Sequence, residues 1–323
     1  MKLLFRWVQE DQPGTRWLQL FERAWPSYRA WFLREGSQAR PSLAKSRQEI
    51  EAFMPELLPM WTHLAELSGE GEMAARMLSL YRPTAFLAGC SQVVWTQDEP
   101  MLVRNYDYDP AACEGTSLLS SWNGTRVLAT SDCLWGALDG MNEHGLAVAL
   151  SFGGAKELGD GFGIPLIVRY VLETCRSVDD AVAVLRRVPS HMVYNVSLLD
   201  ASGEYAVASL GPGRETRVER RAVATNHQGE GAWTEYEEAT HSRERERFLE
   251  DRLRDPHLTR EGLRDLFLEP PLHVREYARG IGTLYTVAYY PRTLRAEFLW
   301  RGAMQAQSLD GLVEKTMVIP LHP

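Results

Sequence analysis

Hydrophobic residues recur at helical spacing over the first quarter of the chain. One stripe of aromatic and aliphatic side chains runs through residues 15–35, and a second runs through residues 42–66. An apolar face with a period of 3.6 residues is typical of an amphipathic helix that packs on a larger surface. Residues 1 to about 80 are therefore expected to be helical. Five of the ten tryptophans lie in this segment, and their helical spacing favours docked helices over an aromatic ligand pocket.

The pattern changes near residue 90 to short β-type runs separated by turns. Helical runs at 164–188, 242–254 and 260–268 interrupt these strands. Asn-Gly, Asp-Gly and Ser-Gly turns join several of them and favour antiparallel pairing. Helices between groups of strands indicate an α+β protein, with the helices packed on the outer faces of its sheets. The expected strands are 88–95, 101–107, 125–131, 134–142, 146–152, 192–200, 205–210, 215–218, 222–225, 283–290 and 295–300.

Composition narrows the class of partner. The chain has 323 residues, of which 45% are hydrophobic, so it can bury a sizeable core. A net charge of -8 argues against a nucleic-acid or anionic membrane surface and favours a small-molecule partner. The four cysteines, which are Cys90, Cys113, Cys133 and Cys175, form no CxxC pair and no metal-ligand spacing with histidine. No metal, cofactor or disulfide framework is therefore expected.

The same features suggest where the protein works. Charged residues interrupt the apolar start of the chain too early for a secretory signal, and no apolar run reaches membrane-spanning length. Unpaired cysteines fit a reducing compartment. We therefore expect a cytoplasmic protein.

Cys90 lies at the start of the first expected hairpin. Residues 88–95 and 101–107 flank a polar turn that ends at Pro100, and their pairing would bring Arg104 and Asp107 near the thiol. A thiol becomes a good nucleophile when a base removes its proton and a cation stabilises the thiolate. Taken alone, a cysteine at a strand start is more often a small buried hydrophobe, so the hairpin only nominates Cys90 as a nucleophile.

Four motifs resemble the N-terminal nucleophile hydrolases related to choloylglycine hydrolase, penicillin V acylase, acid ceramidase and fungal penicillin acyltransferase. They occur in the order of that family over residues 84 to 300. The motifs are Gly89-Cys90-Ser91 with Arg104-Asn105-Tyr106-Asp107, then Gly140-Met141-Asn142-Glu143-His144-Gly145-Leu146, then Thr225-Asn226-His227, and finally Ser242-Arg243.

The resemblance implies a four-layer αββα sandwich whose precursor cuts itself between Gly89 and Cys90. Residues 1–89 would then form a helical pro-segment or small subunit docked on a core of residues 90–323. The free α-amine of Cys90, with a pKa of about 8, would act as the base. Arg104 and Asp107 would fix the amine and the thiolate, and Asn226 would supply the amide of the oxyanion hole.

The resemblance also assigns residues around this centre. Ser242 and Arg243 would lie at a helix start beside the nucleophile, whereas Arg245 and Arg247 are expected on the solvated face of that helix. Asn142 lies in a tight turn and is expected to support the fold without a role in proton transfer.

The implied activity is cleavage or transfer of the acyl group of a linear amide through a thioester. The partners would be a small-molecule amide and, for transfer, an acyl thioester donor; a homo-oligomer is compatible with the sequence. One alternative is a papain-like hydrolase that pairs Cys90 with His144, His227 or His241. The other is a binding protein of the same fold that neither cuts its precursor nor catalyses a reaction.

Overall fold

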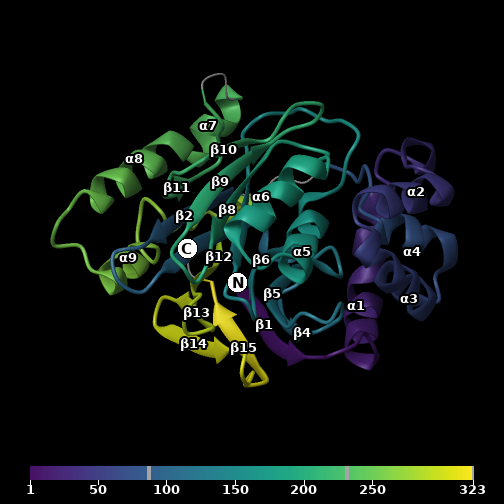
Figure 1. Cartoon of the computed structure of the whole chain (residues 1–323), viewed down its shortest axis with the longest axis horizontal. Helices are drawn as coiled ribbons and strands as arrows, with labels where there is room; N and C mark the ends of the chain where they lie inside the picture. The colour runs from purple at the N-terminus through teal and green to yellow at the C-terminus, as the bar shows by residue number, and fades with distance from the viewer. Residues whose placement is uncertain (86–88, 230–232, 322–323) are drawn as a thin grey trace.

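The computed structural model describes residues 1–85, 89–229 and 233–321 and contains two β-sheets that pack face to face (Figure 1). The larger sheet has the order β10-β9-β8-β7-β6-β5-β4-β1-β15, and the smaller has the order β11-β2-β3-β12-β13-β14. Helices α5 and α6 cover the outer face of the larger sheet, while α8 and α9 cover that of the smaller. This order of layers confirms the expected α+β sandwich.

The elements have the following bounds. The larger sheet contains β1 (Lys2–Gln9), β4 (Thr116–Ser120), β5 (Val127–Asp132), β6 (Gly136–Asn142), β7 (Ala147–Phe152), β8 (Tyr194–Leu199), β9 (Tyr205–Leu210), β10 (Arg217–Glu219) and β15 (Lys315–Pro320). The smaller sheet contains β2 (Gly89–Trp95), β3 (Met101–Tyr108), β11 (Val223–Ala224), β12 (Gly282–Tyr290), β13 (Arg295–Trp300) and β14 (Ala303–Ser308). The α-helices are α1 (Thr15–Phe32), α2 (Leu43–Phe53), α3 (Leu58–Ser68), α4 (Gly71–Leu78), α5 (Ile164–Thr174), α6 (Val178–Arg187), α7 (Thr234–Thr240), α8 (Ser242–Leu253) and α9 (Arg260–Leu266).

The central hairpin is confirmed. Strands β2 and β3 pair antiparallel from Gly89 opposite Asp107 to Trp95 opposite Met101. Both strands are almost wholly buried because one face packs against the larger sheet and the other packs under α8 and α9. The strand pair therefore lies at the centre of the sandwich.

Two long helical stripes are each divided in the structure. The stripe at 42–66 breaks between α2 and α3, where Pro55 cannot donate a backbone hydrogen bond and Met54 leaves the helical region with φ of -141°. The stripe at 164–188 breaks before Ser177, whose side chain caps α6 in a capping box with Asp180. Hydrophobic spacing continues across both breaks, which explains why each pair was expected as one helix.

The N-terminal segment had been expected to be helical throughout, but it begins with a β-strand. Strand β1 lies inside the larger sheet, parallel to β4 and antiparallel to β15. Its buried side chains are Leu3, Phe5 and Trp7, which alternate along the strand with more exposed neighbours. This period of two is the signal of a half-buried strand. Residues before Cys90 therefore supply part of the sheet as well as the helices docked beside it.

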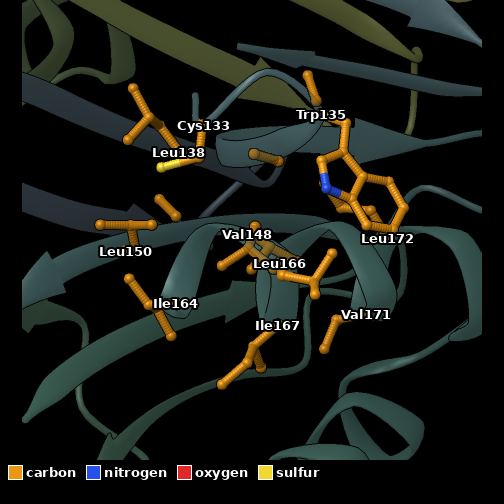
Figure 2. Close-up of a cluster of buried hydrophobic side chains, with 14 of the residues drawn as sticks. Cys133, Trp135, Leu138, Val148, Leu150, Ile164, Leu166, Ile167, Val171 and Leu172 are labelled. Carbon is orange, nitrogen blue, oxygen red and sulfur yellow. The ribbon is translucent and has the colours of Figure 1, made fainter. Parts of the chain in front are cut away.

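Close packing of α5 on the larger sheet explains the glycine at position 140 in β6. Figure 2 shows side chains of α5 and of strands β6 and β7 in one buried cluster that includes Leu138, Val148 and Leu166. A Cβ atom at Gly140 would lie 2.8 Å from both Leu172 Cδ1 and Leu128 O. Glycine at this position therefore allows the helix to approach the sheet.

Helix α1 docks on the core through a buried polar group. The Tyr28 hydroxyl donates to Glu114 Oε1 at 2.7 Å and lies 3.1 Å from Asp132 Oδ1. Burial and the neighbouring Glu114 charge raise the pKa of Asp132 to about 7. These three residues line a cavity of about 330 Å³ between α1 and the ends of β3 and β5.

Within the described ranges, no helix is both long and apolar enough to cross a membrane.

We expect this carboxyl pair to make the fold less stable as the pH rises. Asp132 has a folded pKa of about 7 against an ordinary value of 3.8, so the folded state binds its proton more tightly. This contribution is complete at low pH and is lost as the pH rises through 7. Between pH 5 and pH 8 the unfolding free energy should fall by about 2 to 3 kcal/mol from this group.

Urea unfolding at several pH values measures this effect, in a Cys90→Ala background designed to keep the chain in one piece. Asp132→Asn should flatten the pH dependence, whereas Asp310→Asn, at an exposed position, should leave it unchanged. Equal slopes in the parent and Asp132→Asn would contradict the assignment.

Candidate active site

Cys90 lies at the second position of β2 with its side chain in the space between the two sheets. Its Sγ accepts a hydrogen bond from Arg104 Nη2 at 2.9 Å, and the side chain is 0% exposed. Burial raises the pKa of the Cys90 thiol, and the charge of Arg104 works against that rise. The hairpin pairing therefore brings together the thiol and the cation expected from the sequence.

Arg104 is held in place by the carboxylate of Asp139, which was not among the site residues expected from the sequence. Its Nη1 donates to Asp139 Oδ2 at 2.6 Å and to Leu138 O at 2.9 Å. The Asp139 carboxylate also accepts hydrogen bonds from the hydroxyls of Tyr285 and Tyr289, both at 2.6 Å. A lone aspartate in the apolar strand β6 was the available signal, because a buried charge needs a partner.

Asp107 faces the opposite side of the smaller sheet. Its Oδ1 accepts a hydrogen bond from Thr283 Oγ1 at 2.6 Å, and its Oδ2 lies 3.9 Å from Arg245 Nη1. Burial raises the pKa of Asp107, and Arg245 opposes the rise. A Cβ atom at Gly89 would lie 3.0 Å from Asp107 Cβ, so only glycine fits easily opposite this carboxyl group.

Asn226 follows β11 and contacts the main chain of the cysteine. Its Oδ1 accepts hydrogen bonds from the Cys90 backbone N–H at 2.8 Å and from Arg245 Nη2 at 2.9 Å. Its Nδ2 donates to Phe152 O at 3.2 Å. The structure thus brings Asn226 to Cys90, with the carbonyl side of the amide facing the cysteine nitrogen.

Arg245 belongs to the cluster around Cys90 and Asn226. The prediction that it lies on the solvated face of the helix was therefore wrong. Its side chain is 1% exposed, and its Nη1 donates to Cys90 O and to Ser91 Oγ, each at 2.7 Å. Arg243 instead donates to Gly229 O at the surface and does not contact Cys90. Arg247, by contrast, is exposed as expected.

Helical spacing explains which arginine turns inward. Ser242 is buried at the start of α8, and Leu249 is buried seven residues later. Arg245 lies three residues after the first and four before the second, so it shares their face. The i, i+3, i+7 spacing of Ser242, Arg245 and Leu249 was therefore the sequence signal that could have placed Arg245 on the buried face.

The two remaining expected residues have structural contacts. Asn142 Oδ1 accepts the backbone N–H groups of His144 and Leu146, both at 3.1 Å, and its Nδ2 binds carbonyl groups at the end of α5. Ser242 Oγ accepts the backbone N–H of Asn226 at 2.7 Å. Asn142 therefore fixes a turn, while Ser242 lies next to the cluster.

In the described part of the chain, the hydrogen-bond partner of the Cys90 thiol is Arg104 rather than a histidine, which does not support the papain-like alternative. His227 Nδ1 lies 2.8 Å from Ser242 Oγ, and its Nε2 lies 2.9 Å from Glu246 Oε2. His241 is largely exposed, and Cys90 lies in a strand rather than at the start of a helix. Among the described residues, no group of three or more histidine, cysteine or acidic side chains is arranged to hold a metal ion.

A family model described as acyl-coenzyme A:6-aminopenicillanic acid acyl-transferase matches residues 94–304, which are 211 of the 323 residues. The chain belongs to this family. The resemblance to this family is thereby confirmed, and the matched span contains every motif except Gly89-Cys90-Ser91. Membership in this acyl-transferase family supports an amidohydrolase or acyltransferase as the class of activity. No curated protein sequence matches the chain.

Several solved structures are similar to this acyl-transferase family member. The Caenorhabditis elegans ortholog of N-acylethanolamine-hydrolyzing acid amidase is 15% identical, with 72% of this chain and 100% of that chain covered, at a TM-score of 0.49. Penicillin V acylase from Agrobacterium tumefaciens is 16% identical, with 70% and 90% covered, at 0.44. A mutant conjugated bile acid hydrolase from Clostridium perfringens is 13% identical, with 71% and 96% covered, at 0.43.

A matched pair of variants of this acyl-transferase family member can test the placement of the arginines. Arg245→Lys keeps the charge but cannot reproduce the planar donor set that reaches Cys90, Ser91 and Asn226, so turnover should fall by about a hundredfold. Arg243→Lys should remain within about twofold of wild type, because its guanidinium is hydrogen-bonded to the surface carbonyl of Gly229 and lysine keeps its charge. Steady-state kinetics on a screened acyl-amino substrate would show this. Equal losses in both variants would contradict the placement.

Proposed function

We propose that this protein is an autoprocessing amidohydrolase or acyltransferase that uses Cys90 as an N-terminal nucleophile on a linear amide. The observation that carries the proposal is the double contact of Cys90. Its thiol lies 2.9 Å from the Arg104 guanidinium, and its main-chain nitrogen is hydrogen-bonded to Asn226. A residue that is both nucleophile and base needs both atoms held.

Burial of the thiol supports self-cleavage as the first reaction. Cys90 is 0% exposed in the intact chain, so its sulfur is closed to a substrate from solvent, whereas the carbonyl group of Gly89 is bonded to the Cys90 nitrogen and can be attacked through a five-membered ring. Attack forms a bond from Sγ to the Gly89 carbonyl carbon, and the Gly89–Cys90 C–N bond breaks as the nitrogen takes the proton that the thiol has lost. Water then hydrolyses the resulting thioester, which leaves a Gly89 carboxylate and a free thiol and amine on Cys90.

The same groups would serve turnover after cleavage. The α-amine of Cys90 takes the thiol proton, and the thiolate attacks the substrate carbonyl. Arg104 stabilises the thiolate, and Arg245 holds the carbonyl group of Cys90. Asp107, 3.9 Å from Arg245, would hold the freed amine. The proton then passes from the ammonium group to the leaving amine. For Asn226 to stabilise the oxyanion, its Nδ2 would exchange Phe152 O for the substrate oxygen.

The acyl group of the thioester has two acceptors. Transfer to water gives a hydrolase, whereas transfer to an amine gives an acyltransferase. The family description names both an acyl thioester donor and an amine acceptor, which supports testing transfer from an acyl thioester beside amide hydrolysis.

Intact-mass measurement of the purified protein tests the proposal most directly. Cleavage before Cys90 should give pieces of about 10 and 26 kDa, the larger beginning with cysteine, as the nucleophile rule requires. Activity on an amide should appear together with these pieces. A single intact chain with full activity would overturn the self-cleavage step. A single intact chain without activity would favour the non-catalytic binding protein.

A further inference from the structure

We propose that Glu246, His227 and Ser242 form a positioning relay that fixes the backbone of Asn226 against the nucleophile. This inference rests on the proposed function, in which Asn226 contacts the reacting residue. The relay deepens that function by assigning roles to two residues, His227 and Glu246, that touch neither the thiol nor a substrate.

The three side chains form a continuous chain of contacts that ends at Asn226. Glu246 Oε2 lies 2.9 Å from His227 Nε2, and His227 Nδ1 lies 2.8 Å from Ser242 Oγ. Ser242 Oγ accepts the Asn226 backbone N–H at 2.7 Å. Ser242 and His227 are both buried, at 0% and 4% exposure, so water does not compete strongly for these bonds.

Two segments that lie 15 residues apart in the sequence supply the relay. His227 directly follows Asn226 after β11, whereas Ser242 and Glu246 lie four residues apart on α8 and so share one face of the helix. Arg245 lies on the same face and contacts Asn226 Oδ1 at 2.9 Å. The helix therefore holds Asn226 by both its backbone and its side chain.

Proton positions make the relay directional. The Glu246 carboxylate only accepts hydrogen bonds, so it places the proton of neutral His227 on Nε2 and leaves Nδ1 as an acceptor. Burial alone would raise the pKa of Glu246, but the hydrogen bond from His227 and the charges of Arg221 and Arg243 hold it below its ordinary value. Nδ1 can then accept a hydrogen bond from the hydroxyl of Ser242 or from that of Thr225, whose Oγ1 lies 3.2 Å away. Either arrangement leaves a Ser242 lone pair for Asn226.

The arrangement resembles a serine hydrolase triad only in its residue types. Ser242 Oγ is wholly buried and already accepts the Asn226 N–H, so it has no free approach for an acyl group. It also contacts Thr225 Oγ1 at 3.0 Å. Its geometry therefore suits the positioning of a peptide group rather than nucleophilic attack.

Two amide substitutions of His227 separate the relay from simple packing. His227→Asn can place an amide oxygen near the Nδ1 position, where it still accepts from Ser242 or Thr225. His227→Gln can place its amide nitrogen near the Nε2 position, so it donates to Glu246 but leaves no acceptor at Nδ1. Exposed Glu244→Gln on the same helix serves as the control.

Amide hydrogen exchange at Asn226 in the Cys90→Ala chain is the first measurement. We expect at least tenfold faster exchange in His227→Gln, and exchange close to the parent in His227→Asn and Glu244→Gln. In the cleaved enzyme, kcat should fall about tenfold to a hundredfold in His227→Gln with little change in KM, and His227→Asn should recover most of it.

The outcomes distinguish the relay from the proposed function. Equal exchange at Asn226 in the Gln and Asn variants would overturn the relay, as would equal losses of kcat that follow equal losses of thermal stability. A wild-type protein that is neither cleaved nor active would instead contradict the proposed function. Hydrogen exchange would still decide the relay in that case, because it requires no turnover.

Discussion

The Cys90→Ala variant is expected to remain one chain and to have no measurable turnover. The sulfur is the atom that would attack both the Gly89 carbonyl and the substrate, and alanine offers no replacement for it. Its place beside Arg104 Nη2, 2.9 Å away, is the contact that sets it apart from the other cysteines. Intact mass reports on cleavage, and an assay on a screened acyl-amino compound reports on turnover.

Control variants make this result specific. Cys113→Ala and Cys175→Ala should be cleaved and active at nearly the wild-type level, because their thiols lie outside the contacts of Cys90. Cys90→Ser should still cleave slowly, since a hydroxyl can also attack the preceding carbonyl. Amidase activity that persisted in purified Cys90→Ala would end the assignment of Cys90 as the nucleophile.

Asn226→Ala should lower kcat by about a hundredfold to a thousandfold with little change in KM. An oxyanion donor strengthens its hydrogen bond as the carbonyl oxygen gains charge, so its loss affects the transition state more than substrate binding. The measurement is steady-state kinetics on variants whose cleavage before Cys90 has been confirmed by mass. This check prevents a defect in self-cleavage from being taken for a catalytic one.

Asn226→Asp distinguishes the two ends of the amide. Aspartate keeps an oxygen that can accept from the Cys90 nitrogen and from Arg245, but it has no N–H to offer an oxyanion. The variant should be at least as impaired as Asn226→Ala, because a negative charge would face the developing oxyanion. A raised KM with a wild-type kcat in Asn226→Ala would show that Asn226 contacts the bound substrate. Asn226 would then not be the oxyanion donor.

The sequence predicted the parts of the site that depend on local pairing. Arg104 and Asp107 follow Cys90 across one hairpin, so strand register alone places them near it. Asn226 required the resemblance, because β11 joins β2 across more than a hundred residues and nothing local indicates that pairing. The structure adds that Asn226 meets the cysteine nitrogen with its oxygen.

Arg245 and β1 show why the rest was missed. The alternating charges after Ser242 indicate a solvated helix, and only tertiary packing reveals that Arg245 lies over the carbonyl group of Cys90. Strand β1 buries every second residue, but Leu4 and Val8 make its outward positions partly apolar, so the sequence alternates poorly. Its place between β4 and β15 also depends on pairing with the far end of the chain. Both cases need contacts that sequence spacing does not contain.

The pairing of β1 with β15 offers a way to reorder the chain. Met1 and Leu321 are hydrogen-bonded neighbours, with the N–H of Leu321 2.8 Å from Met1 O, and the two ends of the chain lie close together in Figure 1. A circular permutant could join the ends by a short linker, begin at Cys90 and finish at Gly89. Such a protein would keep every strand of both sheets and present the free amine of Cys90 once its initiator methionine is removed. It would separate the chemistry of Cys90 on substrates from its chemistry on its own chain.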